Sequence, residues 1–326
     1  MGNVATMKSA FAIIAPALLA SAVPARAQQP APLPLRVAVL KQAGLADVFV
    51  AKQAGVFERN GLAVELVEFR TGNEAIAAQQ GGQVDVVIAI PGSAMMAMES
   101  GFDLVLLSQN ETAKTQGPDL GSVQVRPDSG IDDLKGLAGK TIAVSGFHSQ
   151  WTVAVQTLLR RAGLDGDRTQ IVETPFPAMA QALKNKQIDA AAVIDPFATQ
   201  MRESGVGKVI SWSYVETIPG QPVGAWYARA GFVQKNRAAA ERFVKSIHEA
   251  IDFMNADEAR ARESVAAFTG LDRAIIAKMP LNRLSWKVEP ALWQRVADMM
   301  RENGELRSAH AAEEYMSEFV QASIAK

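Results

Sequence analysis

The sequence predicts an α/β fold made of two βαβ-type lobes with a central cleft and a hinge, followed by extra C-terminal helices. Three observations lead to this prediction. Short apolar runs alternate with helical segments at the spacing of βαβ units. One such block recurs 104 residues later in the chain. After position 237 the apolar pattern is helical throughout.

The first block carries a local signal for each of its elements. Its strands are short apolar runs, its helices have the helical period, and Asn-Gly or Gly-Gly follows each helical segment. Its last strand is apolar except for one aspartate, as in a strand buried within a parallel sheet. We expect strands at 35–40, 62–69 and 84–90 and helices at 45–55 and 74–80.

The second block repeats the first. A shift of 104 residues aligns 36–40 with 140–144, and a Gln-x-Asp sequence enters the third strand of both blocks. The aspartates of this sequence, Asp85 and Asp189, precede apolar strand cores and are predicted to be structural. An internal repeat of this kind indicates two lobes of similar construction.

Two crossovers connect the blocks. The segment 103–110 is strand-like and leads into a polar stretch, and 223–228 is a strand that can return to the first lobe. Crossovers near 110–118 and 213–221 would form a hinge. We therefore expect lobe 1 to comprise 28–117 and 218–326, and lobe 2 to comprise 118–217. The helices expected at 237–254, 257–268 and 292–300 are assigned to lobe 1 as packing elements.

The stretch 139–164 reads as a strand, a polar loop and a helix. The helix begins near Trp151 and stops at Gly163, so the loop 145–149 lies at a helix N-terminus. Unpaired backbone N–H groups and the positive end of the helix dipole meet there and favour an anion. The alternative is an ordinary α/β turn.

The N-terminal segment 1–27 has the features of a secretory signal peptide. Lys8 precedes an apolar run at 10–23, and Ala25-Arg26-Ala27 is a small-x-small cleavage sequence. The run is shorter than the ~20 residues that span a membrane. We expect cleavage after Ala27 and export to the periplasm.

Composition excludes several classes of function. The chain has no cysteine, which excludes a lipid anchor, disulfides and thiolate chemistry. Its 33 basic and 34 acidic residues nearly balance, so the composition does not indicate a basic surface that binds nucleic acid. Its three histidines are scattered, so no metal site is expected. No cofactor is expected either, and the protein is predicted to be a monomer.

Four sequence features resemble a known family. They are a Gly55-Val56-Phe57 run followed by Gly61-Leu62, the Gln-x-Asp strand entry, Leu137-Ala138-Gly139-Lys140 before a strand, and Asp195-Pro196-Phe197. In this order they resemble the periplasmic solute-binding proteins of ABC importers for nitrate, sulfonate and taurine, whose superfamily includes thiamine-pyrimidine precursor binders. The resemblance implies a type II periplasmic binding fold, a solute in the cleft, and a permease in the inner membrane as partner.

The carboxyl ends of the predicted strands locate the cleft independently, because ligands of open α/β sheets bind there. Basic side chains on these loops favour an anionic solute, and aromatic residues nearby favour a flat or extended apolar body. For Asp195, capping of its own helix explains the residue as well as ligand contact does. The expected ligand-binding residues are Lys41, Gln42, Arg70, Thr71, Gly92, Ser93, Asn110, Ser145, Phe147, His148, Ser149, Phe176, Asp195 and Trp226.

The sequence therefore predicts a solute-binding subunit of an ABC importer for a small organic anion, a sulfonate or carboxylate. Sequence motifs of hydrolases, phosphate loops and dinucleotide-binding sites are absent. The protein is not expected to be an enzyme. Two alternatives remain open: an exported ligand sensor, and an enzyme like the thiamine-pyrimidine synthases.

Overall fold

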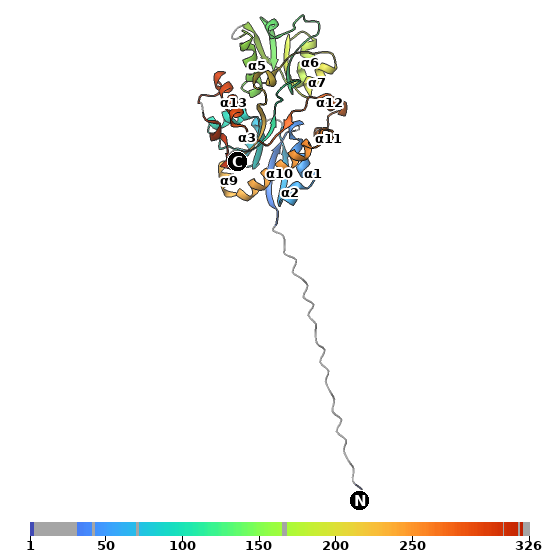
Figure 1. Ribbon diagram of the computed structural model, residues 1–326, viewed down its shortest axis with the longest axis vertical. Coiled ribbons are helices and arrows are strands. Elements are labelled where there is room, and N and C mark those ends of the chain that lie inside the picture. The colour runs from blue at the N-terminus through green and yellow to red at the C-terminus, as the bar shows by residue number, and fades with distance from the viewer. Residues whose placement is uncertain are drawn as a thin grey trace. The chain divides into compact units, whose positions relative to one another are not determined.

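The computed structural model describes residues 1–2, 31–40, 43–69, 72–164, 168–308, 310–318 and 320–321. Contacts between Cα atoms divide the chain into Met1–Ala31 and Pro32–Lys326, and both sheets belong to the second unit (Figure 1). Nearly all of the expected signal peptide lies outside the described residues, as do the expected site residues Lys41, Gln42, Arg70 and Thr71.

The first sheet has six strands in the order β11-β4-β10-β3-β1-β2. β1 pairs in parallel with β2 and β3, whereas β10 runs antiparallel to both β3 and β4. The strands are β1 (Leu33–Val39), β2 (Leu62–Glu68), β3 (Val86–Ala89), β4 (Val105–Thr112), β10 (Pro222–Ala228) and β11 (Arg283–Leu284).

The second sheet has five strands in the order β7-β6-β8-β5-β9. β6 pairs in parallel with β7 and β8, and β5 runs antiparallel to β8 and β9. The strands are β5 (Gly121–Val125), β6 (Thr141–Val144), β7 (Gln170–Glu173), β8 (Ala190–Ile194) and β9 (Lys208–Trp212). We call the first sheet and its helices lobe 1 and the second sheet and its helices lobe 2, and we propose the boundaries predicted from the sequence.

The predicted repeat is visible in the strand order, because β2-β1-β3 in one sheet corresponds to β7-β6-β8 in the other. Asp85 accepts the Arg36 backbone N–H at 2.9 Å and donates its own N–H to the Arg36 carbonyl at 2.8 Å. Asp189 exchanges the same two bonds with Thr141, at 3.0 and 2.9 Å. Both aspartates therefore fix the register between neighbouring strands, which is the structural role predicted for them.

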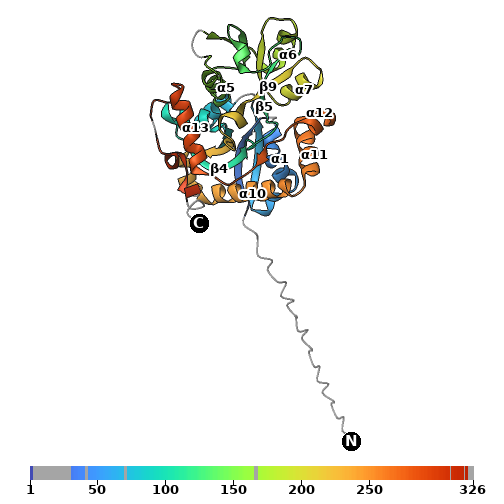
Figure 2. The same ribbon diagram turned by 45° about the horizontal axis from the view of Figure 1, so that its top comes forward.

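Helices cover both faces of the first sheet. Leu35, Val37 and Val39 alternate along β1 toward a core shared with α1 and α10, while Ala38 faces the opposite core. Figure 2 shows α10 along the base of this sheet and α13 beside α5. The helices associated with this sheet are α1 (Ala46–Gln53), α2 (Val56–Arg59), α3 (Gly72–Gln80), α4 (Pro91–Glu99), α9 (Ala230–Lys235), α10 (Arg237–Asn255), α11 (Glu258–Thr269), α12 (Arg273–Lys278) and α13 (Pro290–Glu302), with short 3-10 turns at Ala43–Leu45 and Ala312–Tyr315.

The second sheet carries fewer helices. They are α5 (Gln150–Arg161), α6 (Phe176–Lys184), α7 (Phe197–Glu203) and α8 (Ser213–Thr217), preceded by a 3-10 turn at Leu134–Leu137. The predicted helix after Asp195-Pro196 forms, but it begins at Phe197, one residue later than expected. Asp195 nevertheless accepts the Thr199 N–H at 2.8 Å, as a capping residue does.

The strands of the two βαβ blocks pair in parallel, as expected, whereas the crossover strands β10 and β5 run antiparallel to their neighbours. β5 was not predicted as a strand. It contains Ser122 and Gln124, which break the apolar pattern. In the fold, Gln124 is buried and donates to Ser122 Oγ and to the Ala198 carbonyl, both at 2.9 Å.

Candidate functional site

A cavity of about 910 Å³ opens at the carboxyl ends of the strands. Residues of both lobes line it, among them Leu40 and Ile90 after β1 and β3 and Ile194 at the end of β8. A smaller cavity of about 320 Å³ adjoins it and shares Leu40, Ile90 and other lining residues with it. The cavities therefore lie where the strand order predicts a ligand.

Aromatic side chains form one wall of the larger cavity. The Trp151 and Tyr214 rings meet edge to face at 5.3 Å, and the Phe176 and Phe197 rings stack at 6.1 Å. Gly121 on β5 leaves room for the indole, because a Cβ there would lie 2.0 Å from the Trp151 ring. The wall can accommodate a flat or extended apolar group.

The N-terminus of α5 faces both cavities through Ser145 and Ser149. Ser149 Oγ accepts the Thr152 N–H at 3.2 Å and so caps the helix. His148 has a positive φ of 56° and lines the smaller cavity, with 72% of its side chain exposed. Its Nδ1 lies 2.9 Å from Glu305 Oε2, so the ring is held by an acidic partner.

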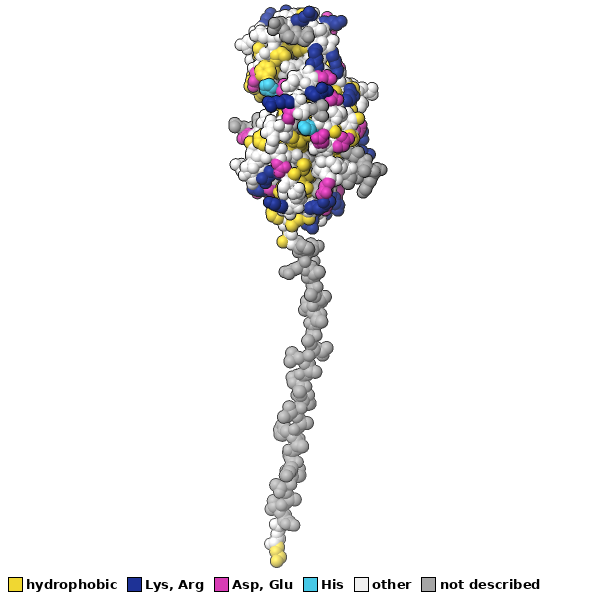
Figure 3. Space-filling model, turned by 90° about the vertical axis from the view of Figure 1, so that its left-hand side faces the viewer, with side chains coloured by type: hydrophobic (Ala, Val, Ile, Leu, Met, Phe, Trp, Pro, Cys, Tyr) yellow, Lys and Arg dark blue, Asp and Glu magenta, His cyan; other side chains and the backbone are white. Residues whose placement is uncertain are grey.

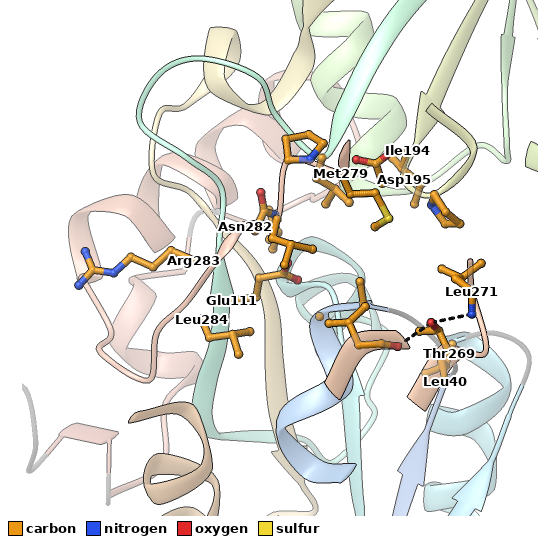
Figure 4. Close-up of a pocket in the computed structure, with 18 of the residues that line it drawn as sticks. Leu40, Glu111, Ile194, Asp195, Thr269, Leu271, Met279, Asn282, Arg283 and Leu284 are labelled. Carbon is orange, nitrogen blue, oxygen red and sulfur yellow. Dashed lines mark hydrogen bonds between the residues drawn. The ribbon is translucent and has the colours of Figure 1, made fainter. Parts of the chain in front are cut away.

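Four carboxyl groups line the larger cavity, and Figure 4 labels two of them, Glu111 of lobe 1 and Asp195 of lobe 2. Burial raises the pKa of Glu111 to about 7; the nearby Asn282 side chain lowers this pKa, and Asp47 and Asp119 raise it further. Burial raises the pKa of Asp195 to about 6, although the hydrogen bonds from Thr199 lower it. In both groups burial disfavours the charged form, because less solvent stabilises the carboxylate.

The three described basic side chains that line the larger cavity are engaged or directed elsewhere. Arg262 binds Glu258 at 2.8 Å and donates to the carbonyls of Ile276 and Met279. Arg283 is exposed and points away from the other labelled residues in Figure 4. Burial raises the pKa of Asp119 to about 6, and the charge of half-buried Lys114 lowers it. Among the described residues, carboxyl groups of the lining therefore outnumber the basic groups available to the cavity.

The structure places seven expected site residues in the cavity linings. Ser93, Phe147 and His148 line the smaller cavity, Phe176 and Asp195 line the larger one, and Ser145 and Ser149 line both. Phe147 is one of the exposed large apolar side chains, at the edge of the smaller cavity.

Three expected site residues lie outside both linings. Gly92 donates its N–H to Gln150 at 2.8 Å, and Asn110 donates to Asp47 at 2.8 Å. Trp226 is fully buried against Phe243 in the lobe 1 core. The structure therefore gives these three residues packing or hydrogen-bonding positions in the interior.

Sequence reasoning missed the contribution of the C-terminal region to the cavity. α11 and the segment after α12 supply one side of it, although only their packing role was predicted. It also missed Tyr214 of α8, which lines the larger cavity. No local signal distinguishes these residues, because their place at the cavity depends on contacts between segments that are distant in the sequence.

Neither a membrane span nor a metal cluster is found among the described residues. No helix there is long and apolar enough to cross a bilayer. No three His, Cys, Asp or Glu residues of the described part are grouped to hold a metal ion.

Comparison with known proteins identifies the family. The sequence model of the NMT1-like family matches residues 28–269, which is most of the chain. This chain belongs to the NMT1-like family. A binding protein of Brucella abortus (strain 2308) is 25% identical to this NMT1-like chain over 244 residues, covering 74% of it and 73% of the relative.

Solved structures show the same fold at low sequence identity. The alkanesulfonate-binding protein SsuA of Xanthomonas axonopodis, bound to MOPS, has a TM-score of 0.71 and 19% identity, covering 89% of this chain and 99% of that one. The periplasmic nitrate-binding protein NrtA of Synechocystis has a TM-score of 0.73 and 13% identity, covering 90% and 88%. This NMT1-like chain therefore has the periplasmic binding protein fold, as the sequence predicts.

Proposed function

We propose that this NMT1-like protein is the extracytoplasmic solute-binding subunit of an ABC importer, which captures a small organic solute between its lobes and delivers it to a membrane permease. The observation that carries the proposal is the cavity of about 910 Å³ at the strand ends of both sheets. A cavity of this size suits a small molecule. The family match and the fold support the same class of protein.

The solute proposed is an organic anion, a sulfonate or carboxylate with an apolar body, aliphatic or aromatic. The N-terminus of α5, a 12-residue helix, offers N–H groups and a positive dipole end to the anionic group. The aromatic wall formed by Trp151, Tyr214, Phe176 and Phe197 suits the apolar body. Ser145 and Ser149 are the proposed hydroxyl contacts.

Binding is proposed to close the lobes about the two crossovers, without a chemical step. We place the protein in the periplasm, after removal of 1–27, as a monomer without a lipid anchor. An exported sensor would need the same cavity. A pull-down with candidate membrane partners separates the two, because the importer subunit binds a permease and the sensor a receptor.

A thermal-shift screen of the mature protein tests the proposal. The panel contains alkane and arene sulfonates, nitrate, aliphatic and aromatic carboxylates, and pyrimidines, and mass spectrometry follows each compound. We expect a sulfonate or carboxylate to raise Tm with dose and to be recovered unchanged. Turnover of a compound, with no compound raising Tm, would contradict a binding function.

A further inference from the structure

The smaller cavity has a carboxyl group and the proposed anion site in one lining. Glu111 of β4 lines this cavity from lobe 1, and the loop before α5, 145–149, lines it from lobe 2. The cavity measures about 320 Å³, so it has room for only a small group. An anionic group at α5 and an ionised Glu111 would therefore repel each other across it.

Two glycines leave room for the Glu111 side chain at this cavity. A Cβ at Gly44 would lie 2.3 Å from Glu111 Oε2, and a Cβ at Gly224 would lie 3.7 Å from the same oxygen. Both glycines line the smaller cavity. Figure 4 shows Glu111 beside Asn282, which lines the larger cavity. The fold therefore places this carboxyl group where the two cavities adjoin.

The surroundings of Glu111 disfavour its charged form. Burial raises the pKa of Glu111 to about 7, the Asn282 side chain lowers it, and Asp47 of α1 and Asp119 of the crossover after β4 raise it again. In the described part of the chain, no basic group acts on the pKa of Glu111. A solute anion would be a further negative charge beside this carboxyl group.

The basic groups nearby act on other acids. The charge of Lys114 lowers the pKa of Asp119, and Arg262 of α11 pairs with Glu258 at 2.8 Å. The other titratable or charged groups on the elements around Glu111 are His148 and Asp195 of lobe 2, Tyr214 of α8, His248 of α10 and Arg283 of β11.

We propose that Glu111 takes up a proton when the lobes close on an anionic solute, so that the affinity of the cavity falls as the pH rises. This coupling rests on the proposed function and adds a dependence on pH to it. A protonated Glu111 carries no charge and has an O–H that can donate to the anionic group. An ionised Glu111 repels that group, so the solute is captured together with the proton.

The direction of the effect follows from the charges. An anion beside Glu111 raises the pKa of this carboxyl group above its value in the free protein. The affinity is therefore fully present below the pKa of the free protein, about 7, and is lost as the pH rises through the pKa of the complex. A nearby like charge shifts a pKa by about one pH unit or more, which corresponds to a loss of about 10-fold or more.

Isothermal titration between about pH 6 and 9 measures this dependence. The probes are benzenesulfonate, hexanesulfonate and the tightest anion of the thermal-shift screen, because sulfonates and carboxylates stay ionised over this range. Imidazole and Tris buffers at constant ionic strength contain no sulfonate or carboxylate that could compete. We expect Kd to rise by about 10-fold across the range. A constant Kd, or tighter binding at high pH, overturns the inference.

Variants assign the proton. Glu111→Gln keeps the size of the side chain, and we expect its Kd to be nearly constant above about pH 7. Histidines change charge near neutral pH, so His148→Asn is the second variant; asparagine tolerates the positive φ of 56° at this position. Asp195→Asn removes a carboxyl group that lines only the larger cavity. Both should retain the loss of affinity above about pH 7, as should Glu65→Gln, at an exposed position outside both linings.

The outcomes separate this coupling from the proposed function. A loss of affinity above about pH 7 that persists in Glu111→Gln overturns the assignment to this residue. Binding that does not depend on pH in the wild type overturns the coupling but leaves a solute-binding function intact. Binding of no anion, and of no other compound in the screen, overturns both. Circular dichroism and Tm at each pH establish that every variant tested is folded.

Discussion

At the residue scale, several buried carboxyl groups have raised pKa values. Asp47 has no exposed surface and shares a hydrogen bond with Asn110. Burial raises its pKa from 3.8 to about 7, against hydrogen bonds that lower it. The folded chain keeps a proton on Asp47 that the unfolded chain loses above about pH 4. The stabilisation that Asp47 contributes is therefore fully present below about pH 4 and is lost as pH rises through about 7.

Replacing Asp47 by asparagine should therefore remove part of this pH dependence. We expect Asp47→Asn to raise Tm at pH 8, because the free energy of unfolding there should increase by up to about a few kcal/mol. We also expect Tm to depend less on pH between 5 and 8. Thermal denaturation followed by circular dichroism measures both. Glu65→Gln, at an exposed position, is the control and should change neither. An unchanged slope in Asp47→Asn would contradict the account.

At position 121, packing explains why the residue is glycine. Adding a methyl group there places it 2.0 Å from the Trp151 ring, so Gly121→Ala should destabilise the fold by about 1–3 kcal/mol, the usual cost of overpacking. The displaced indole should also change the intrinsic fluorescence. In Gly81→Ala the new Cβ would lie at least 3.5 Å from its neighbours, and we expect both properties to be retained. Equal Tm for the two variants would refute the packing argument.

Individual residues also show why only part of the site could be predicted from the sequence. Asn110 and Glu111 are neighbours on β4, where successive side chains point to opposite faces. The pairing of β4 with β10 shifts register here, with Gly224 opposite Glu111. A bulge redirects side chains, so tertiary pairing and not local sequence decides that Glu111 lines the cavity while Asn110 is buried.

At the element scale, Gln150 connects the first turn of α5 to lobe 1. Its Oε1 accepts the Gly92 N–H of α4 at 2.8 Å, and its Nε2 donates to Gln221 and to the Pro222 carbonyl at 3.0 and 2.9 Å. All of this side chain is buried. The three bonds fix the loop before α5 relative to the crossover strand.

Gln150→Ala leaves the buried Gly92 N–H and the Pro222 carbonyl without these partners. Each unpaired group costs about 1–3 kcal/mol, so we expect Tm to fall by several degrees. Differential scanning calorimetry measures the shift. Gln156→Ala, on the same helix at a half-buried position, should lower Tm much less. A comparable loss in both variants would mean that the bonds of Gln150 contribute little.

The contact between α12 and α7 also links the lobes. Lys278 pairs with Glu203 of α7, and its carbonyl accepts a bond from Arg202 at 3.2 Å. Lys278→Ala should speed amide hydrogen exchange in Phe197–Glu203 with little loss of Tm, because exposed pairs contribute about 0–1 kcal/mol.

The control for this link lies on the same helix. Arg273 pairs with Glu263 of α11, within lobe 1. Arg273→Ala should leave exchange in α7 unchanged, as measured by mass spectrometry of α7 peptides. If both variants affect α7 equally, the Lys278 contact is not a specific link.

At the scale of the whole molecule, the sequence predicted what local periodicity and repetition determine. The two blocks, their strands and the long C-terminal helices follow from apolar patterns, and the loops at 145–149 and 195 follow from the strand ends. The antiparallel strand β5 and the C-terminal lining of the cavity could not be predicted. Both depend on contacts between distant segments, such as Gln124 with Ala198.

On the face shown in Figure 3, basic and acidic side chains of the described residues are interspersed. Inside the molecule, carboxyl groups and aromatic rings line the larger cavity. Any solute that binds should do so at this place and with one molecule per chain.

The most direct test of the central claim, that the cavity between the sheets holds the solute, is isothermal titration of the tightest compound from the thermal-shift screen into wild type and Ile194→Trp. Ile194 lines the cavity and is partly exposed, so tryptophan there fills the space. Phe102→Trp, at an exposed position outside both cavity linings, controls for the added indole. The account predicts one site per chain, at least 10-fold weaker binding in Ile194→Trp and no change in Phe102→Trp. Unchanged affinity in Ile194→Trp would contradict it.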